Sequence, residues 1–574
     1  MKNSKLDNNI ITADTETVLI DGIHTPYLIS FYDGKISESI FNKDPDKLVK
    51  DFIDKLFIKN YNNKIVYLHN FAGFDVYFIF KHLIKYTKVK PLIHDGQFIS
   101  IEAKYKNIKL IFRDSYKHLP TSLEKLANSF GAENKGIFPY YLKDLNYKGT
   151  YPDYKYFDPN KISIEEYDNY LKNFGNKIWS FEDESIKYCE QDCRSLHQII
   201  SKYNELFFKN FGFNIHKYPT LPSLAFANYR TNFMKDENIA SITGRVSKEI
   251  RLSYTGGALD MYIPKPLKGI KIHAYDVNAL YPFVMRTFEY PVGNPTYFRG
   301  NIFINKDNPF GFFYCKINAP DSLKHPILQT HYKTKDGMRT VSPLGKFESW
   351  FFSEELYNAE KYGYKFEILR GYLFENDYIF KDYVDILYKM RLQYPKSHPL
   401  NFLAKLYLNS LYGRFGMKDI FDDIVNFEKN DNELYEKNNN ILDLFDIGSY
   451  IICKLKKPIE DILNKEDYNN INIAIASAVT SYARIHMSQF KNNPNLPNLY
   501  YTDTDSAYFD DPLPESFISN TILGKMKLEG IYDKAIFLAP KLYALENTKN
   551  GESIIKIKGL NKESIKKIIL LLIY

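Results

Sequence analysis

The chain alternates short apolar runs with longer stretches in which apolar residues recur every three or four positions. From about residue 10 to residue 115, three β-rich runs (IITADTETVLI, KIVYLHN and KLIFRDS) are separated by helical stretches. A repeat of two predicts a strand, and a repeat near 3.6 predicts a helix. The alternation therefore predicts an α/β domain that starts at once.

A long helical stretch ends this first domain. ESIKYCEQDCRSLHQIISKYNELFF keeps the helical repeat, and Gly212, Pro219 and Pro222 follow it. Because Gly and Pro interrupt regular structure, we place the boundary near residue 210. Residues 1–210 form one predicted domain, and residues 211–574 form a second.

Length and composition exclude a disordered protein and a protein with a single core. The 574 residues are too many for one hydrophobic core, and 44% hydrophobic with 25% charged residues is typical of a globular protein. A net charge of +7 suits a partner that carries phosphates, although an ordinary basic enzyme has a similar excess.

The cysteines and the two ends of the chain exclude some further classes. Cys189, Cys193, Cys315 and Cys453 are too scattered for a disulfide framework, so we expect reduced, buried thiols and no zinc. The start, MKNSKLDNNI, has neither a secretory nor a transit-peptide pattern. The apolar residues 568–574 are far too few to cross a bilayer, so no membrane partner is predicted.

Three segments of the first domain carry acidic residues. Asp14 and Glu16 lie two apart in a β-rich run, so both carboxylates point to one face. Asp75 follows the apolar run IVYL, and Tyr188 and Asp192 share one helical face at i, i+4. Carboxylates suit Mg²⁺ or Mn²⁺, and two such ions can cleave a phosphodiester. Each piece alone has an ordinary explanation, such as a solvated hairpin end.

Together these segments resemble the DEDD-type proofreading exonucleases of the subtype with tyrosine in the third motif. The resemblance implies two metal ions held by Asp14, Glu16, Asp75 and Asp192. It also implies that Tyr188 orients the attacking water. The implied contacts to the single-stranded 3′ end are Asn70, Phe74, Ser122 and Leu123. Ser122 has a second explanation, since a serine before LEKL is a common helix cap.

Two segments of the second domain place acidic residues at strand ends. HAYDVNALYPFVM predicts a strand that ends at Asp276, followed by a turn with Tyr281. YYTDTDSAYF places Asp503 and Asp505 around a tight turn between strands. Asp276 and Asp505 could hold two Mg²⁺ ions that activate a primer 3′-OH and stabilise pyrophosphate as it leaves. Tyr281 is placed to exclude a ribose 2′-OH.

The segment KLYLNSLYGRFGMK predicts a helix with a functional face. Lys405, Asn409 and Tyr412 fall within about 60° of one another and offer a cation, an amide and a ring. Lys405 could neutralise a triphosphate, Tyr412 could pack under the new base pair, and Gly413 could let another backbone approach closely. Asn, Ser and Gly are mediocre or poor helix formers, so their presence in an apolar helix indicates a functional constraint.

These three segments resemble motifs A, B and C of the family B DNA polymerases, and the resemblance covers almost the whole chain. It implies an α/β and α+β multidomain fold: a ribonuclease H-like exonuclease domain, then a right-hand palm and fingers domain with two insertions and a truncated thumb. The implied catalytic residues of the polymerase are Asp276, Asp503 and Asp505. The implied DNA contacts are Tyr254, Gly256 and Gly257 of a YxGG segment and Lys541 and Tyr543 of a KxY motif. Ala279 stands where the family has serine, which removes a hydroxyl but no metal ligand.

The spacing of the motifs predicts two insertions. About 130 residues separate Asp276 from Lys405, and about 90 separate Tyr412 from Asp503, far more than a strand–helix connection needs. Insertions at these places resemble those of the protein-primed branch of family B, found in small-phage and mitochondrial linear-plasmid polymerases. The resemblance implies that residues 290–385 bind a terminal protein and that residues 419–460 help displace a DNA strand. Ordinary surface elaborations are the alternative.

The resemblance also divides the second domain. The implied parts are a palm at 211–289 and 461–559, a terminal-protein insertion at 290–385, fingers at 386–418, a second insertion at 419–460 and a partial thumb at 560–574.

We therefore predict a DNA-directed DNA polymerase with a 3′→5′ proofreading exonuclease and two Mg²⁺ or Mn²⁺ ions in each site. Its predicted partners are template–primer DNA, dNTPs and a terminal protein, and we expect a monomer. An exonuclease-only enzyme or an inactive DNA-binding remnant is the alternative. The nuclease residues and Tyr281 disfavour an RNA polymerase or reverse transcriptase. Abundant Lys, Asn, Ile and Tyr are typical of AT-rich coding DNA and predict a mitochondrial protein, with a cytoplasmic one as the alternative.

Overall fold

The computed structural model of the chain consists of two compact units. The structure describes residues 5–94, 97–134, 136–234, 239–304, 307–335, 337–417, 422–428, 441–447, 450–456 and 472–558. The first unit comprises Met1–Asn232, Met390–Leu406 and Ile420–Glu466, and the second comprises Phe233–Lys389, Tyr407–Asp419 and Asp467–Tyr574. The boundary predicted near residue 210 coincides with the end of a helix, whereas the first unit continues to Asn232. The division into named domains stays a prediction.

The first unit is built on a seven-stranded sheet with the order β3-β2-β1-β4-β7-β6-β5. The central strands β1, β4 and β7 are parallel, and the outer pairs are antiparallel. These central strands coincide with the three β-rich runs of the sequence. The bounds are β1 (Ile10–Ile20), β2 (Ile23–Tyr32), β3 (Ser37–Phe41), β4 (Ile65–Leu68), β5 (Lys88–His94), β6 (Gln97–Tyr105) and β7 (Ile108–Asp114).

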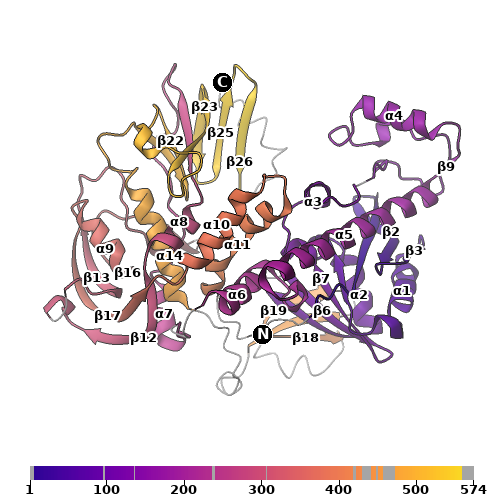
Figure 1. Ribbon diagram of the computed structural model, residues 1–574, viewed down its shortest axis with the longest axis horizontal. Helices are drawn as coiled ribbons and strands as arrows, with labels where there is room; N and C mark the ends of the chain where they lie inside the picture. The colour runs from indigo at the N-terminus through magenta and orange to yellow at the C-terminus, as the bar shows by residue number, and fades with distance from the viewer. Residues whose placement is uncertain are drawn as a thin grey trace. The chain divides into compact units, whose positions relative to one another are not determined.

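The two faces of β1 differ, and helices pack on both. Ile11 and Ala13 join a buried core with residues of α1 and α2, whereas the Thr12 hydroxyl donates to a backbone carbonyl of α5 at 2.7 Å. The strand repeat of two therefore turns Asp14 and Glu16 toward α5 as well. In Figure 1 the long helix α5 runs along the sheet. The bounds are α1 (Pro45–Leu56), α2 (Val76–Tyr86), α3 (Leu123–Phe130), α4 (Ile164–Phe174), α5 (Phe181–Phe211) and α6 (Leu221–Asn232).

Two small antiparallel sheets also belong to the first unit. β8 (Lys148–Gly149) pairs with β9 (Trp179–Ser180). β18 (Asp422–Glu428), β20 (Tyr450–Lys456) and β19 (Ile441–Ile447) form a three-stranded sheet within the predicted second insertion. β18 ends at Glu428 and β19 begins at Ile441, and residues 429–440 between them lie outside the described residues.

The second unit has a central antiparallel sheet with the order β10-β21-β22-β11-β23. The buried helix α14 packs against α7, α8 and α9. The strands are β10 (Leu259–Met261), β11 (Ile272–Val277), β21 (Leu499–Asp503), β22 (Ser506–Phe509) and β23 (Met526–Tyr532). The helices are α7 (Gly244–Arg251), α8 (Leu280–Thr287), α9 (Ser353–Glu360) and α14 (Ile473–Ser488).

A four-stranded antiparallel sheet, β12-β17-β13-β16, lies within the predicted insertion at 290–385, and we call it the second sheet. α9 covers it with Leu356 and Ala359, which pack against Phe313 and Ile368 in one apolar core. The strands are β12 (Tyr290–Arg299), β13 (Gly311–Ala319), β16 (Gly345–Phe352) and β17 (Lys365–Asp377), and β14 (Thr330–Thr334) and β15 (Gly337–Val341) form a hairpin.

Further elements complete the described chain. β24 (Lys534–Ala539), β25 (Leu542–Asn547) and β26 (Glu552–Ile557) form a three-stranded sheet. α10 (Lys381–Gln393) and α11 (Pro399–Phe415) each have residues assigned to both units. The predicted partial thumb at 560–574 lies outside the described residues. None of the helices in the described part of the chain combines the length and the apolarity that a membrane span requires.

Candidate active sites

Asp14 and Glu16 lie on β1, on the side that faces α5. Their carboxylate oxygens and the Cys189 sulfur of α5 all lie within 4.8 Å of one another. The Cys189 thiol also donates to the backbone carbonyl of Asp14 at 3.6 Å. The structure therefore brings the two carboxylates together, and it adds a buried thiol for which the sequence predicts no role in the site.

Asp75 and Asp192 are buried, each with only 2% of its surface exposed. Asp75 precedes α2 and Asp192 lies on α5. Burial and then the charge of Asp14 raise the pKa of Asp75 well above its usual range. Oδ1 of Asp75 has no hydrogen-bond partner among the described residues. Both observations fit a bound divalent cation, because a cation stabilises crowded carboxylates in their charged form.

Tyr188 lies one helical turn before Asp192 on α5. Burial and then the charges of Asp192 and Glu16 raise the pKa of Tyr188 far above its ordinary value, which keeps the phenol protonated. Its hydroxyl hydrogen-bonds to that of Tyr140. The sequence offers no signal for Tyr140, because this tyrosine lies in a loop without a periodic pattern. β1, the start of α2 and α5 thus bring the four acidic residues and Tyr188 into one neighbourhood.

The residues expected to contact a DNA 3′ end lie in two loops of the first unit. Asn70 is exposed and has a left-handed backbone, with φ of 64°, and Phe74 is half-buried. Ser122 caps α3, of which Leu123 is the first residue, as the alternative explanation for this serine anticipated. The two loops are joined because the His69 ring donates to the backbone carbonyl before Ser122 at 2.8 Å.

The central sheet of the second unit brings Asp276 to the turn between β21 and β22. Asp276 lies opposite Ser506 in the register of β11 and β22. The N–H group of Val277 donates to the carbonyl of Asp505 at 2.8 Å. Burial and then the charge of Asp503 raise the pKa of Asp505. These crowded, half-buried carboxylates offer only oxygen ligands, which suits Mg²⁺ or Mn²⁺.

The turn itself is held by backbone contacts. Thr504 has φ of 62°, a conformation that is rare for a β-branched residue. Its N–H group donates to the carbonyl of Ala258 at 2.9 Å, and the N–H group of Asp505 donates to the backbone carbonyl of Asp503 at 2.7 Å. A Cβ on Gly257 would lie 2.5 Å from the Thr504 methyl carbon. The YxGG segment therefore needs glycine at this position so that it can lie against the turn.

Tyr254 and Gly256 lie in the same segment. The Tyr254 hydroxyl would be 2.8 Å from a Cβ on Gly416, so Tyr254 packs beside the end of α11. Gly256 is exposed, and a Cβ there would meet no described atom within 4 Å.

Lys541 and Tyr543 border the same turn. The Lys541 ammonium pairs with the Asp503 carboxylate at 3.1 Å, and the Tyr543 hydroxyl bonds to that of Tyr508 at 2.9 Å. A cleft of about 620 Å³ opens here, lined by the three carboxylates and these two KxY residues. Further lining residues that the sequence does not single out are Thr504, Ser506, Glu529, Lys556 and Lys558.

Tyr281 stacks on Tyr412, with ring centroids 4.4 Å apart and an interplanar angle of 21°. The sequence predicts a turn at Tyr281, but Tyr281 and the following Pro282 both lie in the first turn of α8. Proline is tolerated there because the first N–H groups of a helix have no intrahelical partner. Ala279, just before the helix, has a left-handed backbone with φ of 51°.

The predicted functional helix is α11. Lys405, Asn409 and Gly413 are exposed on it at i, i+4 and i+8, and Tyr412 is half-buried. A Cβ on Gly413 would meet no heavy atom of the described protein within 4 Å. The expected close approach of another backbone to Gly413 is therefore not made within the described chain.

The chain thus has two compact units, each with a group of carboxylates that its strands and helices bring together. Residues 55–497 match the family described as DNA polymerase type B, organellar and viral. The chain belongs to this family, and the predicted membership in family B is confirmed. Membership implies a general dependence on divalent metal ions.

Individual proteins support this assignment. A probable DNA polymerase of Neurospora intermedia is 36% identical over 575 residues, which cover 95% of this chain and 58% of that protein. A probable DNA polymerase of Ascobolus immersus is 35% identical over 577 residues, or 96% of this chain and 47% of that protein. The chain thus spans about half the length of these curated relatives.

The structural comparison concerns the fold. Phi29 DNA polymerase complexed with primer-template DNA aligns with a TM-score of 0.68 and 18% identity, covering 97% of this chain and 93% of that one. The expected multidomain fold of mixed sheets and helices is confirmed.

Proposed function

We propose that this chain is a DNA-directed DNA polymerase with 3′→5′ exonuclease activity. The observation that carries the proposal is the meeting of Asp276 with the Asp503–Asp505 turn in a cleft bordered by Lys541. The primer 3′ oxygen attacks the α-phosphorus of a dNTP, a new P–O bond forms, and pyrophosphate leaves. Asp276 and Asp505 would hold two Mg²⁺ or Mn²⁺ ions, which would supply positive charge for the attacking 3′ oxygen and for the oxygen of the leaving pyrophosphate.

Other residues bind and select the substrates. Lys405 neutralises the triphosphate, and Asn409, Tyr412 and Gly413 lie along the same helix and bind the nucleotide. Tyr281, fixed by its stack on Tyr412, forms a wall against the ribose 2′-OH. Template–primer DNA is bound by Tyr254, Gly256, Gly257, Lys541 and Tyr543.

The first unit removes nucleotides from a DNA 3′ end. Water attacks the terminal phosphodiester, and a nucleoside monophosphate leaves. Asp14, Glu16, Asp75 and Asp192 would hold two such ions, which would supply positive charge for the attacking water and the phosphate, and the raised pKa of Asp75 supports this role. Tyr188 remains protonated and orients the water. The frayed end is bound by Asn70, Phe74, Ser122 and Leu123.

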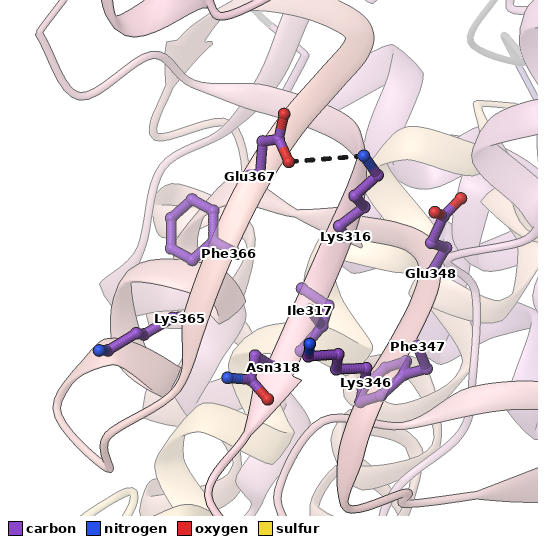
Figure 2. Close-up of a pocket in the computed structure, with 9 residues that line it drawn as sticks. All are labelled: Lys316, Ile317, Asn318, Lys346, Phe347, Glu348, Lys365, Phe366 and Glu367. Carbon is purple, nitrogen blue, oxygen red and sulfur yellow. Dashed lines mark ion pairs between the residues drawn. The ribbon is translucent and has the colours of Figure 1, made fainter.

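Protein priming is a further part of the proposed function. A hollow on the second sheet is lined by residues of β13, β16 and β17, among them Lys316, Lys346, Lys365, Phe347 and Phe366 (Figure 2). The lining also contains Glu348 and Glu367, of which Glu367 pairs with Lys316 at 3.6 Å, so the lysines exceed the acidic residues by one. Lysines in excess beside aromatic rings suit an acidic protein surface with apolar residues. We assign this hollow to the terminal protein, in agreement with the implied role of residues 290–385.

The remaining parts of the proposal concern organisation. Residues 1–210 are the exonuclease, and the second domain is divided as the resemblance implies, with residues 419–460 helping to displace a DNA strand. The protein acts in mitochondria, which the organellar and viral family description supports. It acts as a monomer.

Separate variants test the two sites. Asp505→Asn should abolish nucleotide addition to a primer but leave 3′→5′ degradation of single-stranded DNA. Asp14→Ala with Glu16→Ala should do the reverse. Degradation without any addition by the wild-type protein would favour the exonuclease-only alternative. DNA binding without either activity would favour the inactive remnant, and loss of both activities in one folded variant would reject two separate sites.

A further inference from the structure

The segment 254–258, which contains the YxGG residues, is held at several backbone carbonyls. The His331 ring donates from Nε2 to the Tyr254 carbonyl at 3.1 Å. Arg484 donates from Nη1 to the carbonyls of Thr255 and Gly256 at 2.8 and 2.9 Å. The segment is also bonded to the polymerase site, because the Ala258 carbonyl accepts a hydrogen bond from the N–H group of Thr504. The position of the Asp503–Asp505 turn therefore depends on the groups that hold this segment.

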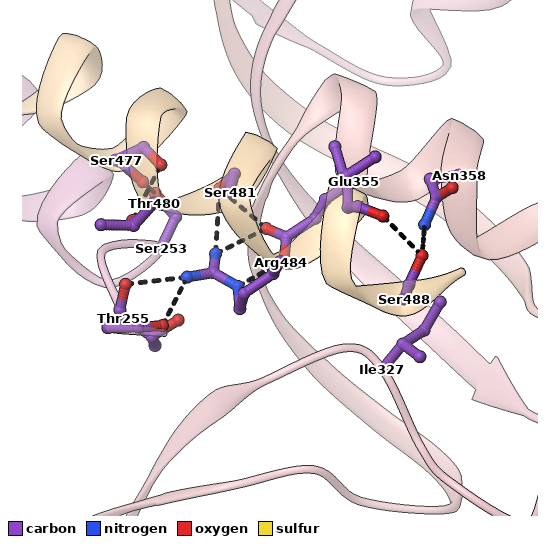
Figure 3. A network of polar contacts seen from close by, with 12 residues as sticks. Ser253, Thr255, Ile327, Glu355, Asn358, Ser477, Thr480, Ser481, Arg484 and Ser488 are labelled. Atoms are coloured by element: carbon purple, nitrogen blue, oxygen red, sulfur yellow. Dashed lines mark hydrogen bonds and ion pairs between the residues drawn. The ribbon is translucent and has the colours of Figure 1, made fainter. Parts of the chain in front are cut away.

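Arg484 is itself fixed by a buried carboxylate. Nε donates to Glu355 Oε1 at 2.7 Å, and Nη2 donates to Glu355 Oε2 and to the Ser481 hydroxyl, both at 2.9 Å. Only 3% of the Arg484 side chain and 5% of the Glu355 side chain are exposed. A guanidinium has five N–H donors, and with the two carbonyls every one is used (Figure 3). Such a fork fixes orientation as well as distance.

Two of the holding groups come from elements attached to the second sheet. Glu355 lies on α9, and His331 lies on β14. Both elements are encoded between Asp276 and Lys405, in the stretch that the sequence marks as an insertion. α9 is fixed to α14 by a further bond, from the Asn358 amide to the Ser488 hydroxyl at 3.0 Å.

A simple structural role is the competing explanation, since a buried ion pair can join two helices and do nothing else. The arrangement of the donors points elsewhere. Arg484 donates from Nη1 to two carbonyls of the 254–258 segment, whereas its other two nitrogens donate to Glu355 and Ser481. The Glu355 carboxylate therefore fixes the orientation in which the guanidinium meets the segment. His331 holds the same segment independently of this pair.

We propose that Glu355 and His331 are positioning residues of the polymerase site. They hold the 254–258 segment and, through Ala258 and Gly257, the turn that carries Asp503 and Asp505. Residues 290–385 then help to position the polymerase site in addition to binding the terminal protein. This inference rests on the proposed polymerase function.

Hydrogen exchange tests the positioning role without metal or DNA. Glu355→Gln keeps the shape of the side chain but replaces the carboxylate that faces the Arg484 guanidinium with a neutral amide. The amides of residues 499–509, which include Thr504, should then exchange at least about tenfold faster, whereas those of β13 should be unchanged. Glu360→Gln, on the exposed end of α9, is the matched control and should exchange like the wild type.

Metal dependence gives a second readout. The Mg²⁺ concentration for half-maximal primer extension should rise about tenfold in Glu355→Gln, since groups that orient metal ligands typically change metal affinity or activity by about 10–100-fold. Degradation of single-stranded DNA by the first unit should be unchanged.

His331 provides the test if Glu355→Gln does not fold. His331→Ala should accelerate exchange at 499–509, and His331→Gln, which keeps an N–H donor, should restore protection. Unchanged exchange in folded Glu355→Gln and in His331→Ala would overturn the inference. A wild-type protein that extends no primer would instead overturn the proposed function, and the exchange result would still decide the positioning role.

Discussion

Tyr281 depends on Tyr412 for its orientation, because the two rings stack 4.4 Å apart. Tyr281→Val should open space for a ribose 2′-OH, so discrimination against ribonucleotides should fall at least about tenfold. Each tenfold loss corresponds to about 1.4 kcal/mol in the relative transition-state free energy. The ratio of kcat/KM for a dNTP and its rNTP measures the change.

Tyr281→Phe separates the ring from the hydroxyl in this experiment. It keeps the wall and should keep most of the discrimination. A Tyr281→Val enzyme with the wild-type ratio would show that Tyr281 does not exclude the 2′-OH.

The buried side chain of His118 should make the stability of the first unit sensitive to acid. It is buried, its Nε2 lies 2.8 Å from the Tyr218 carbonyl, and burial lowers its pKa to about 3. Below about pH 6.5 this histidine is protonated in the unfolded chain but stays neutral in the folded chain. Its contribution to the free energy of unfolding is therefore fully present above this pH and is lost as the pH decreases. Between pH 6.5 and pH 5 the free energy of unfolding should fall by about 2 kcal/mol from this group alone.

His118→Gln should reduce this pH dependence, because glutamine does not titrate. Urea unfolding at pH 7.5 and pH 5 measures it, with His24→Gln at an exposed imidazole as the control. Equal slopes for the wild type and His118→Gln would refute the assignment.

At the scale of elements, two neighbouring glycines should respond differently to one methyl group. A Cβ at Gly257 would lie 2.5 Å from the Thr504 methyl carbon, but one at Gly256 would meet no described atom within 4 Å. Gly257→Ala should therefore lower the free energy of unfolding by about 1–3 kcal/mol, the usual cost of overpacking. Gly256→Ala should change it by less than about 0.5 kcal/mol.

Thermal or urea unfolding of the second unit compares these two variants. Primer extension should fall with Gly257→Ala because the same methyl group pushes on the turn that carries Asp503 and Asp505. Equal stability of both variants would show that the segment and the turn adjust freely.

The predictable elements are those whose signal is local. Asp14 and Glu16 share a strand face because of their spacing, and β21 and β22 flank the turn at Asp503 as their aromatic runs indicate. The first turn of α8 is missed because proline resembles a turn signal there. The bond between Glu355 and Arg484 joins residues 129 positions apart, and a glutamate on a helix is usually solvated. No local pattern distinguishes such a buried pair.

At the scale of the molecule, the second sheet has two roles in these proposals. Its hollow at Lys346 and Lys365 is the proposed terminal-protein site, and its helix α9 supplies Glu355 to the polymerase site. Deletion of residues 290–385 would therefore damage DNA synthesis even if no terminal protein existed. Only surface changes can separate priming from extension.

A charge reversal in the hollow makes this separation. Lys316→Glu, Lys346→Glu and Lys365→Glu together should lower nucleotide attachment to a terminal protein at least about tenfold, because the surface would repel an acidic partner. Extension of a DNA primer should remain near the wild-type rate, since none of these lysines belongs to the polymerase cleft. The assay combines polymerase, candidate terminal protein, template ends, Mg²⁺ and one labelled dNTP, and it measures label that stays on protein after denaturation.

The control carries the same charge change on the first unit, at the exposed residues Lys88, Lys90 and Lys104. This control should attach nucleotide to the terminal protein as well as the wild type does, because only the surface of the second sheet is proposed to bind the terminal protein. Label on protein should also disappear in Asp276→Asn and Asp505→Asn, since priming and extension use the same carboxylates. If the hollow variant primes as well as the control, the terminal protein does not dock there. If the wild type starts only from a nucleic-acid 3′-OH, protein priming is wrong for this chain.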